Sequence, residues 1–387
     1  MDFSFNRIQS LVKKNVQRFA EDILAPIAPE LDRESKPLPK DIIELMAKQK
    51  LFGIQVAEKY EGAGLDSISY VAAIEEISKV CGATGLMLTV HNSVAAAPIE
   101  KFGTEDQKQN YLKDLASGRK IGAFSITEPN AGSDAMGLLT TAEKDGNDYI
   151  LNGQKCFVTN GGVADTFLIG AVHDRKAKAK GIGVFIVDKK MPGFKVGKIE
   201  AKLGVRSNQV SELFMDNVRV PTENVLGKLD DGFKIMMQTL DIGRIGIGTQ
   251  GLGIAQAAYQ AAAKYANERR QFGKPIGQFQ AIGFKLAEMK AALDASRFLI
   301  YRAAWMKDQK MPFSVESAMA KMYATDSAMR VCTDAIQIFG GYGFIQDLPT
   351  ERYFRDVKIT QIYEGTNEIM KIIIGNAILK EFASTGF

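Results

Sequence analysis

The sequence predicts an α+β protein of three domains: an N-terminal helical domain, a middle antiparallel β domain and a C-terminal helical domain. Its 387 residues exceed the length at which a single hydrophobic core stops growing. Apolar residues recur at helical spacing in both end regions. Between them lies a stretch of short β-branched and aromatic runs. We therefore place the domains at residues 1–120, 121–227 and 228–387.

The first domain is predicted to be helical because its apolar residues recur every three or four positions. The N-terminal segment shows this spacing at Ile8, Leu11, Val12, Phe19 and Ile23. The segment also carries acidic residues and no continuous apolar run, so we interpret it as an amphipathic helix and not as a signal peptide. Later segments repeat the pattern: EDILAPIAPELD, KDIIELMAKQ and SYVAAIEEISKV.

The middle domain is predicted to be a small, mostly antiparallel sheet because turn signals separate its apolar runs. The turn signals are DGND, NGG and MPG. The strand-like runs are YILNG, CFVTNG, TFLIGAV, GVFIVD and SELFMDNVRV. After residue 228 the helical period returns for about 160 residues, in stretches such as IAQAAYQAAAKYANERR.

One glycine pattern resembles a dinucleotide-binding fingerprint. Gly246, Gly248 and Gly251 are spaced as GxGxxG, and Glu268 follows seventeen residues after the last glycine. The fingerprint requires a strand before it and a βαβ unit around it. Both flanks here have helical periodicity, so we expect these glycines to let helices approach closely, without a Rossmann fold.

Composition and charge exclude several classes of protein. Apolar residues make up 46% of the chain and charged residues 24%, as in an ordinary globular protein. The net charge of +4 comes without long basic runs, so no nucleic-acid partner is expected. No apolar run approaches the length of a membrane span. A cytoplasmic protein fits these features, as does a processed mitochondrial one.

Cysteine and histidine usage argues against disulfides and metal sites. The three cysteines, Cys81, Cys156 and Cys332, are widely separated and form no CxxC. The two histidines, His91 and His173, have no metal-binding spacing, so no metal is predicted. We interpret His91 as a hydrogen-bonded structural histidine in preference to a pocket residue.

Three polar, glycine-rich segments stand out. In IYEGTNEIMKIIIGNAI, Glu364 lies between Tyr363 and Gly365, and Thr366 is a good N-cap for a helix whose apolar face holds Ile369, Ile372, Ile373 and Ile378. A carboxylate there serves as general base, as ligand contact or as helix-dipole partner, and this segment alone leaves the three open. Alone, QIFGGYGF is typical of a helix C-cap and SITEPNAGSDA of a polar loop.

Together these segments resemble the acyl-CoA dehydrogenase family over essentially the whole chain. SITEPNAGSD and RYFRDVKITQIYEGTNEI are similar to the two family signatures. KCFVTNGG, LDIGRIGIG, ERRQFGKPIGQFQ and QIFGGYGF match in order and spacing. The resemblance implies a C-terminal four-helix bundle, an FAD cofactor, an acyl-CoA substrate, electron-transfer flavoprotein as acceptor and a homotetramer built as a dimer of dimers.

The resemblance also implies roles for individual residues. Glu364 matches the base that removes the α-proton. Positions that match contacts with the flavin are Phe124, Ile126, Thr127, Phe157, Thr159, Thr366 and Glu368. Those that match contacts with the FAD of a neighbouring subunit are Arg269, Phe272, Gln280, Gln337, Gly340 and Gly341. Those that match substrate contacts are Ser133, Asp241, Arg244, Tyr363 and Gly365.

Two departures from the family pattern bear on function. Phe157 stands where many relatives have tryptophan. Gly243 stands where some branched-chain relatives carry their base, which favours Glu364.

Segments such as LDIGRIGIG most resemble the short-chain, butyryl-type branch. A cyclic or branched acyl group such as cyclohexanecarbonyl remains an alternative, as does a flavin acyl-CoA oxidase of the same fold. Outside this enzyme class, the alternatives are a nucleic-acid-binding member of the fold, which calls for a dense basic stripe, and a non-enzymatic helical scaffold.

Overall fold

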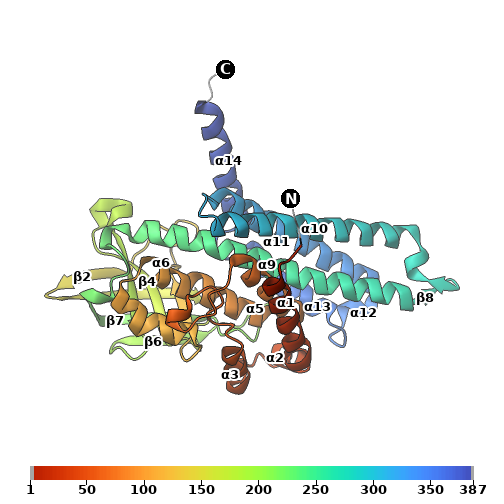
Figure 1. Ribbon diagram of the computed structural model, residues 1–387, viewed down its shortest axis with the longest axis horizontal. Coiled ribbons are helices and arrows are strands. Elements are labelled where there is room, and N and C mark those ends of the chain that lie inside the picture. The colour runs from red at the N-terminus through yellow and green to blue at the C-terminus, as the bar shows by residue number, and fades with distance from the viewer. Residues whose placement is uncertain (1–3, 385–387) are drawn as a thin grey trace.

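The computed structural model describes residues 4–384 and shows a sheet region placed between helical regions (Figure 1). The N-terminal part is helical as predicted. Its α-helices are α1 (Arg7–Phe19), α2 (Ala28–Arg33), α3 (Lys40–Lys48), α4 (Ser67–Val80), α5 (Gly82–Thr89), α6 (Ala97–Phe102), α7 (Glu105–Gln107) and α8 (Lys113–Ala116). A π-helical stretch, Val90–Ala96, links α5 to α6 and is completely buried.

A single sheet forms the middle of the chain. Its strands are β1 (Gly122–Ser125), β2 (Thr141–Asp145), β3 (Asp148–Val158), β4 (Thr166–Val172), β5 (Ile182–Asp188), β6 (Phe194–Ile199) and β7 (Ser211–Pro221). The order is β1-β4-β2-β3-β7-β6, and β5 pairs with β4. The contacts of β4 with β1 and β2 are parallel, and the other pairings are antiparallel.

One detail of the strand prediction is wrong. The runs YILNG and CFVTNG were expected as two strands, but they belong to the single strand β3. Gly153, between them, has φ +152° and coincides with a shift in the register between β3 and β7. A glycine inside a strand can mark a bulge as well as a turn, and here it marks a bulge.

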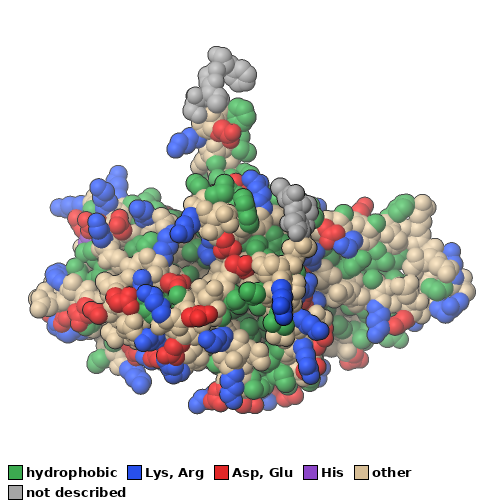
Figure 2. Space-filling view, viewed as in Figure 1, with side chains coloured by type: hydrophobic (Ala, Val, Ile, Leu, Met, Phe, Trp, Pro, Cys, Tyr) green, Lys and Arg blue, Asp and Glu red, His purple; other side chains and the backbone are tan. Residues whose placement is uncertain are grey.

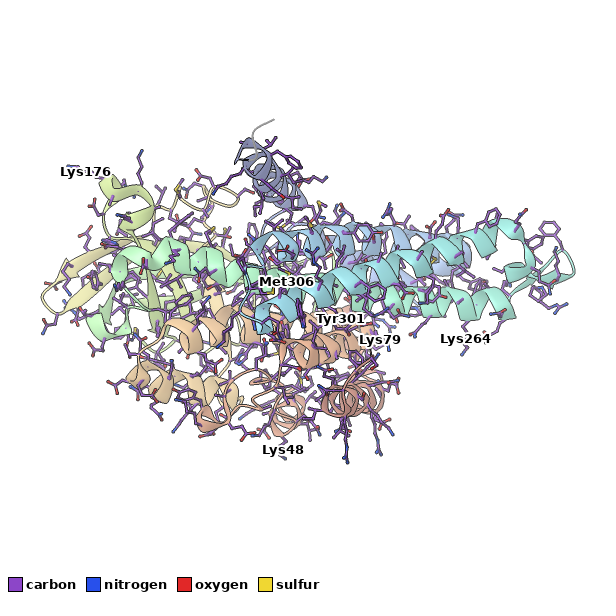
Figure 3. All side chains as sticks on the ribbon, turned by 45° about the horizontal axis from the view of Figure 1, so that its top comes forward. Lys48, Lys79, Lys176, Lys264, Tyr301 and Met306 are labelled. Carbon is purple, nitrogen blue, oxygen red and sulfur yellow. The ribbon has the colours of Figure 1, made fainter. Side chains whose placement is uncertain are left out.

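Long helices make up the C-terminal region. They are α9 (Gly232–Glu268), α10 (Gln280–Asp308) and α11 (Ser314–Phe339), followed by α12 (Gly341–Phe344), α13 (Thr350–Lys358) and α14 (Asn367–Ser384). A short hairpin, β8 (Arg270–Gln271) and β9 (Lys274–Pro275), joins α9 to α10 at the far end of the molecule (Figure 1). Lys264, near that end of α9, is labelled in Figure 3.

The GxGxxG pattern lies inside α9, so the prediction that it is not a Rossmann fingerprint is confirmed. A Cβ added to Gly246 would lie 2.4 Å from Thr89 Cγ2, and one added to Gly253 would lie 2.6 Å from the Glu75 carbonyl oxygen. Real Cβ atoms do not approach other atoms so closely. The glycines therefore let α9 pack directly against α4 and α5.

The structural interpretation of His91 is also confirmed. Its Nε2 lies 3.0 Å from the Leu115 carbonyl oxygen, and its Nδ1 accepts a hydrogen bond from Gly122 N at 3.0 Å. Complete burial lowers the pKa of His91 to about 4, so the ring is neutral. The ring thus joins the helical region to the first strand.

Two predicted apolar faces are only partly buried. Thr366 caps α14 as expected, because its Oγ1 accepts a hydrogen bond from Ile369 N at 3.3 Å. However, α14 projects from the body of the molecule (Figure 1), and Ile372 and Ile378 are 55% and 45% exposed. On α1, Ile8 and Leu11 are exposed in the same way. The periodicity identified the helices, but each face is only partly covered: on α1, Phe19 is buried and Val12 packs against the core, whereas Ile8 is exposed.

Charged side chains of both signs are interspersed over the face shown in Figure 2, without a continuous basic stripe. Among the described residues, no helix combines the length and hydrophobicity that a membrane crossing requires.

Candidate active site

Glu364 lies on a tight turn between α13 and α14. Its φ is +52°, and that of Gly365 is +95°, so two consecutive residues have left-handed backbone. A non-glycine residue in this region is uncommon and costs about 1–3 kcal/mol, and such strain is concentrated at functional sites. A side chain on Gly365 would meet Met370 Cε at 2.7 Å. The turn therefore requires glycine after the glutamate.

The Glu364 carboxylate points inward, toward α9. Both of its oxygens are buried and have no hydrogen-bond partner, although part of the residue is exposed. A Cβ added to Gly243 would lie 1.8 Å from Glu364 Oε2. The carboxylate thus occupies the space that a side chain at Gly243 would fill. Burying an unpaired carboxylate destabilises the folded state, so such a group in a native structure indicates a functional role.

Burial raises the pKa of Glu364 to about 7, while the positive charges of Arg244 and Lys321 act to lower it. Arg244 is 4% exposed and donates to Asp241 at 2.5 Å. Ser314 also donates to Asp241, at 2.8 Å. The Arg244 Nε has no partner. The carboxylate is therefore positioned to take up a proton near neutral pH.

The residues predicted at the flavin come together at the ends of β1 and β3. Cys156 N donates to the Thr127 carbonyl oxygen at 3.0 Å and ties the two segments. Phe157 has φ +56° and is 67% exposed, so its ring stands out from the sheet beside Thr159. Phe124 and Tyr363 pack against the same small cluster, which includes Val94 and Ile247. The flavin-side residues and the Glu364 turn therefore lie on neighbouring surfaces. Ile126 is half-buried at the end of β1, and Ser133 is exposed in the following loop.

A buried ion pair that sequence reasoning missed holds the SITEPNAGSD loop. Glu128 accepts a hydrogen bond from Lys155 Nζ at 2.7 Å, and both side chains are buried. The same carboxylate accepts hydrogen bonds from Leu139 N at 2.6 Å and Thr140 N at 3.0 Å. A fully hydrogen-bonded buried pair fixes the loop in one conformation. The sequence contained a signal for this pair, since the SITEPNAGSD segment includes Glu128.

The second predicted group lies at the far tip of the helical region. Arg269, Phe272 and Gln280 surround the β8–β9 hairpin, and Gln337, Gly340 and Gly341 end α11. Phe272 is 92% exposed, and Arg269 lies over the Tyr342 ring at 5.6 Å. Arg269, just after the end of α9, lies twenty-five positions beyond Arg244, or about 37 Å at helical rise. The structure therefore brings the predicted residues together in two places, not one.

Thr366 and Glu368 begin α14 next to the Glu364 turn. Glu368 is exposed, whereas Glu364 has its carboxylate buried. The two acidic groups are four residues apart but have opposite environments.

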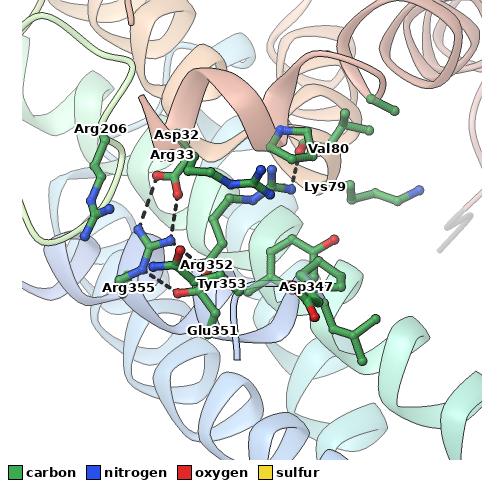
Figure 4. Close-up of a pocket in the computed structure, with 15 residues that line it drawn as sticks. Asp32, Arg33, Lys79, Val80, Arg206, Asp347, Glu351, Arg352, Tyr353 and Arg355 are labelled. Atoms are coloured by element: carbon green, nitrogen blue, oxygen red, sulfur yellow. Dashed lines mark hydrogen bonds and ion pairs between the residues drawn. The ribbon is translucent and has the colours of Figure 1, made fainter. Parts of the chain in front are cut away.

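A separate surface cavity of about 360 Å³ lies between α2, the end of α4 and α13 (Figure 4). Arg355 donates to Asp32 at 2.6 Å and to Glu351 at 2.6 Å. Because these charges are already paired with one another, we interpret them as salt bridges that hold α2 against α13. The candidate active site is therefore at Glu364 and not at this cavity.

Comparison with known proteins agrees with this geometry. Residues 6–119, 123–218 and 230–379 match the N-terminal, middle and C-terminal domains of acyl-CoA dehydrogenase. These are oxidoreductase domains, and the matches follow one another along the chain. The chain therefore belongs to the acyl-CoA dehydrogenase family, and the predicted fold class is confirmed.

Individual relatives narrow the comparison. The short-chain specific acyl-CoA dehydrogenase of Clostridium acetobutylicum is 47% identical over 98% of this chain and all of its own. The butyryl-CoA dehydrogenase structure from Megasphaera elsdenii is 46% identical, with a TM-score of 0.96, and covers 98% of this chain and 100% of its own. A chain in a structure described as the electron transferring flavoprotein of Acidaminococcus fermentans is 48% identical, with a TM-score of 0.96 and the same coverage. Structures of this fold have also been solved with FAD.

Proposed function

We propose that this protein oxidises a short-chain acyl-CoA to the trans-2-enoyl-CoA, with Glu364 as the base that removes the α-proton. The observation that carries the proposal is the buried, unpartnered carboxylate opposite Gly243. A general base works best when its pKa is near the working pH, and burial raises the pKa of Glu364 to about 7.

The α-proton of a thioester is weakly acidic, so its removal requires a positioned carboxylate and donors for the developing enolate oxygen. Glu364 takes the proton on its carboxylate, and its backbone N–H would donate a hydrogen bond to the developing enolate oxygen. Gly365, without a side chain, leaves room for the thioester. When FAD is bound, its flavin accepts the hydride that leaves the β-carbon.

The surface at the ends of β1 and β3 fits a flavin. The Phe157 ring is 67% exposed, beside Thr127 and Thr159, and a side chain at Gly132 would meet nothing within 4 Å. An exposed aromatic ring next to backbone and hydroxyl groups suits a flat heterocycle that needs both stacking and hydrogen bonds. Thr366 and Glu368 would hold the same cofactor from the α14 side.

We propose that a short acyl chain lies along α9 beyond Gly243. Gln250 lies seven residues beyond Gly243, or about 10 Å along the helix. Its side chain is buried, donates to the Gly82 carbonyl oxygen at 2.8 Å and accepts a hydrogen bond from the Tyr363 hydroxyl. A polar pair at this depth would limit the acyl chain to a few carbon atoms. The short-chain specific name of the Clostridium relative points the same way.

We expect butyryl-CoA to exceed octanoyl-CoA in kcat/KM by at least about 10-fold, because each surplus methylene in a tight pocket costs about 1–3 kcal/mol. Steady-state rates with a panel of linear, branched and cyclic acyl-CoA substrates would measure this. A faster reaction with octanoyl-CoA or with cyclohexanecarbonyl-CoA would replace the short-chain assignment and leave the dehydrogenase assignment in place.

We also infer a homotetramer, arranged as a dimer of dimers, and an electron-transfer flavoprotein as acceptor. The exposed isoleucines of α14 and the exposed ring of Phe272 are apolar surface that a second copy of the chain would cover. The Acidaminococcus relative comes from a structure named for an electron-transferring flavoprotein. A long-lived reduced flavin in air would favour this acceptor, and rapid reoxidation by oxygen would favour the oxidase alternative.

Glu364→Gln tests the proposal. The amide keeps the size of the side chain but is not basic, so the fold, FAD content and acyl-CoA binding should persist. A general base contributes about 10²–10⁴-fold, and we expect flavin reduction to slow by at least ~10³. Stopped-flow bleaching of FAD-loaded protein by saturating butyryl-CoA without oxygen measures this rate.

Glu368→Gln is the matched control, because it removes a carboxylate four residues away on the exposed side of the turn. That variant should change FAD affinity more than the rate of reduction. If the Glu364→Gln protein bleaches nearly as fast as the wild type, the base is elsewhere and the proposal is wrong.

A further inference from the structure

Lys321 is a completely buried lysine in the middle of α11. Its neighbours one turn away, Ala318 and Ala324, are small, so α11 lies close to the Glu364 turn on this side. Burying an ammonium group is expensive unless its hydrogen bonds are satisfied. No motif accounts for this residue, and the mechanism proposed above does not use it.

The Lys321 ammonium group binds the C-terminal side of the catalytic turn. It donates to the Gly365 carbonyl oxygen at 2.7 Å and to Asn367 Oδ1 at 2.8 Å. Asn367 in turn donates to Thr325 Oγ1 at 2.9 Å and to Asp326 Oδ1 at 2.7 Å. The residues just after Glu364 are therefore anchored to α11 by a connected network. Such networks fix one conformation of the backbone they hold.

Charged groups from three other positions face Lys321. They are Glu364 on the same turn, Arg244 on α9 and Glu368 on α14; Asp326 lies one turn further along α11. Burial lowers the pKa of Lys321 to about 7, and the Glu364 carboxylate opposes that change by favouring the ammonium form. Reciprocally, a charged Lys321 favours the carboxylate form of Glu364.

We propose that Lys321 is a positioning residue for the reaction: through the Gly365 carbonyl it holds the strained Glu364 turn, and through its charge it sets the pH above which Glu364 is basic. This inference rests on the proposed role of Glu364. Lys321 makes no hydrogen bond with the Glu364 carboxylate and does not line the space opposite Gly243. It therefore acts through the backbone of the turn and through the electrostatic field of its charge.

Three variants separate the two contributions. Lys321→Met removes both the donor and the charge, Lys321→Gln keeps an amide donor without the charge, and Lys321→Arg keeps the charge. Lys307→Met is the control, because Lys307 is another largely buried lysine of the helical region, with Ser67 as its hydrogen-bond partner at 3.0 Å. The measurement is the rate of anaerobic flavin reduction by saturating butyryl-CoA between pH 5.5 and 9, on FAD-loaded tetramer.

We expect the pH midpoint of flavin reduction to rise by about one unit in Lys321→Met and Lys321→Gln, since loss of a nearby positive charge favours the protonated acid. The plateau rate at high pH should fall at least ~10-fold in Lys321→Met and less in Lys321→Gln, which can still bind the Gly365 carbonyl. Lys321→Arg and Lys307→Met should keep the wild-type midpoint.

A wild-type midpoint in Lys321→Gln overturns the inference, whether or not the rate falls. Lys321→Gln also decides the matter if Lys321→Met does not fold. Failure of this inference is distinct from failure of the proposed function: an inactive Glu364→Gln protein together with unshifted Lys321 variants would leave the base assigned and Lys321 without a catalytic role.

Discussion

The Glu364 turn and the β8–β9 tip are the two places where predicted functional residues gather, and they differ in burial. Both have left-handed backbone, since Glu364 and Phe272 each have φ +52°. At the turn the functional oxygens are buried, and one of them occupies the space left by Gly243. At the tip, about 37 Å along α9, Phe272 is 92% exposed, and added side chains at Gly273, Gly340 and Gly341 would meet nothing.

The difference indicates that one chain completes the first region but not the second. The Glu364 carboxylate already has its buried position against Gly243 within one chain. An exposed aromatic ring such as Phe272 gains a defined role only when another molecule covers it. We propose that a cofactor bound at the tip belongs to another copy of the chain, because Arg269 lies about 37 Å along α9 from Arg244.

The largest effect is expected from Gly243→Ala. The added methyl group would lie 1.8 Å from Glu364 Oε2, so the carboxylate must leave its position against α9. A displaced base loses most of the 10²–10⁴-fold that a positioned one contributes, and we expect flavin reduction to slow by about 10³-fold. Stopped-flow measurement of flavin reduction by butyryl-CoA gives this rate.

Gly248→Ala is the control for that change, because its added methyl group would meet Ile300 at an ordinary 3.4 Å. Alanine in a helix interior is favoured over glycine by about 1 kcal/mol, so this variant should reduce flavin normally and be no less stable. Normal reduction in Gly243→Ala would mean that the carboxylate does not stand against α9 during the reaction.

A second effect concerns the pH dependence of stability. The pKa of Glu364 is raised from 4.5 to about 7 in the folded protein, so the folded state holds this proton more tightly than the unfolded state. The resulting stabilisation is complete below pH 4.5 and is lost as the pH rises to 7, a change of about 3 kcal/mol.

Urea unfolding of wild type and Glu364→Gln at pH 5 and pH 8, at equal protein concentration, tests this. The wild type should lose about 3 kcal/mol more than the variant between the two pH values. Equal losses would mean that the carboxylate is solvated in the folded protein, as it is at Glu368.

The smallest effect is expected at the tip. Arg269→Glu reverses a charge that the resemblance assigns to a neighbour's FAD, and loss of a charge-assisted hydrogen bond should lower FAD retention about 10-fold or more. Cofactor retention and assembly should weaken together, because each stabilises the other by mass action. Flavin absorbance after gel filtration and sedimentation of the same sample provide both readings.

Lys264→Glu, on an exposed part of the same helix, makes an equal change in charge and should alter neither FAD content nor assembly. A monomeric Arg269→Glu protein with full FAD would show that the tip takes no part in a shared site, and the contrast between the two regions would then have another cause.

The sequence by itself determined the order of helices, sheet and helices, because amphipathic spacing and turn residues are local properties. It also determined that Gly246, Gly248 and Gly251 lie in a helix, since their flanks have helical periodicity. The place of Glu364 between Tyr363 and Gly365 marked it as a candidate, and the resemblance to the family implied its role as the base.

Only the tertiary structure decided which residues meet. Gly243 and Glu364 are 121 residues apart, and nothing local shows that one provides the space for the other. Lys321 is an unremarkable lysine in α11 until folding brings it to the Gly365 carbonyl. Likewise, the isoleucines of α14 form an apolar stripe in sequence, but the fold leaves Ile372 and Ile378 exposed. Contacts between distant segments depend on how helices pack, and local spacing carries no information about that packing.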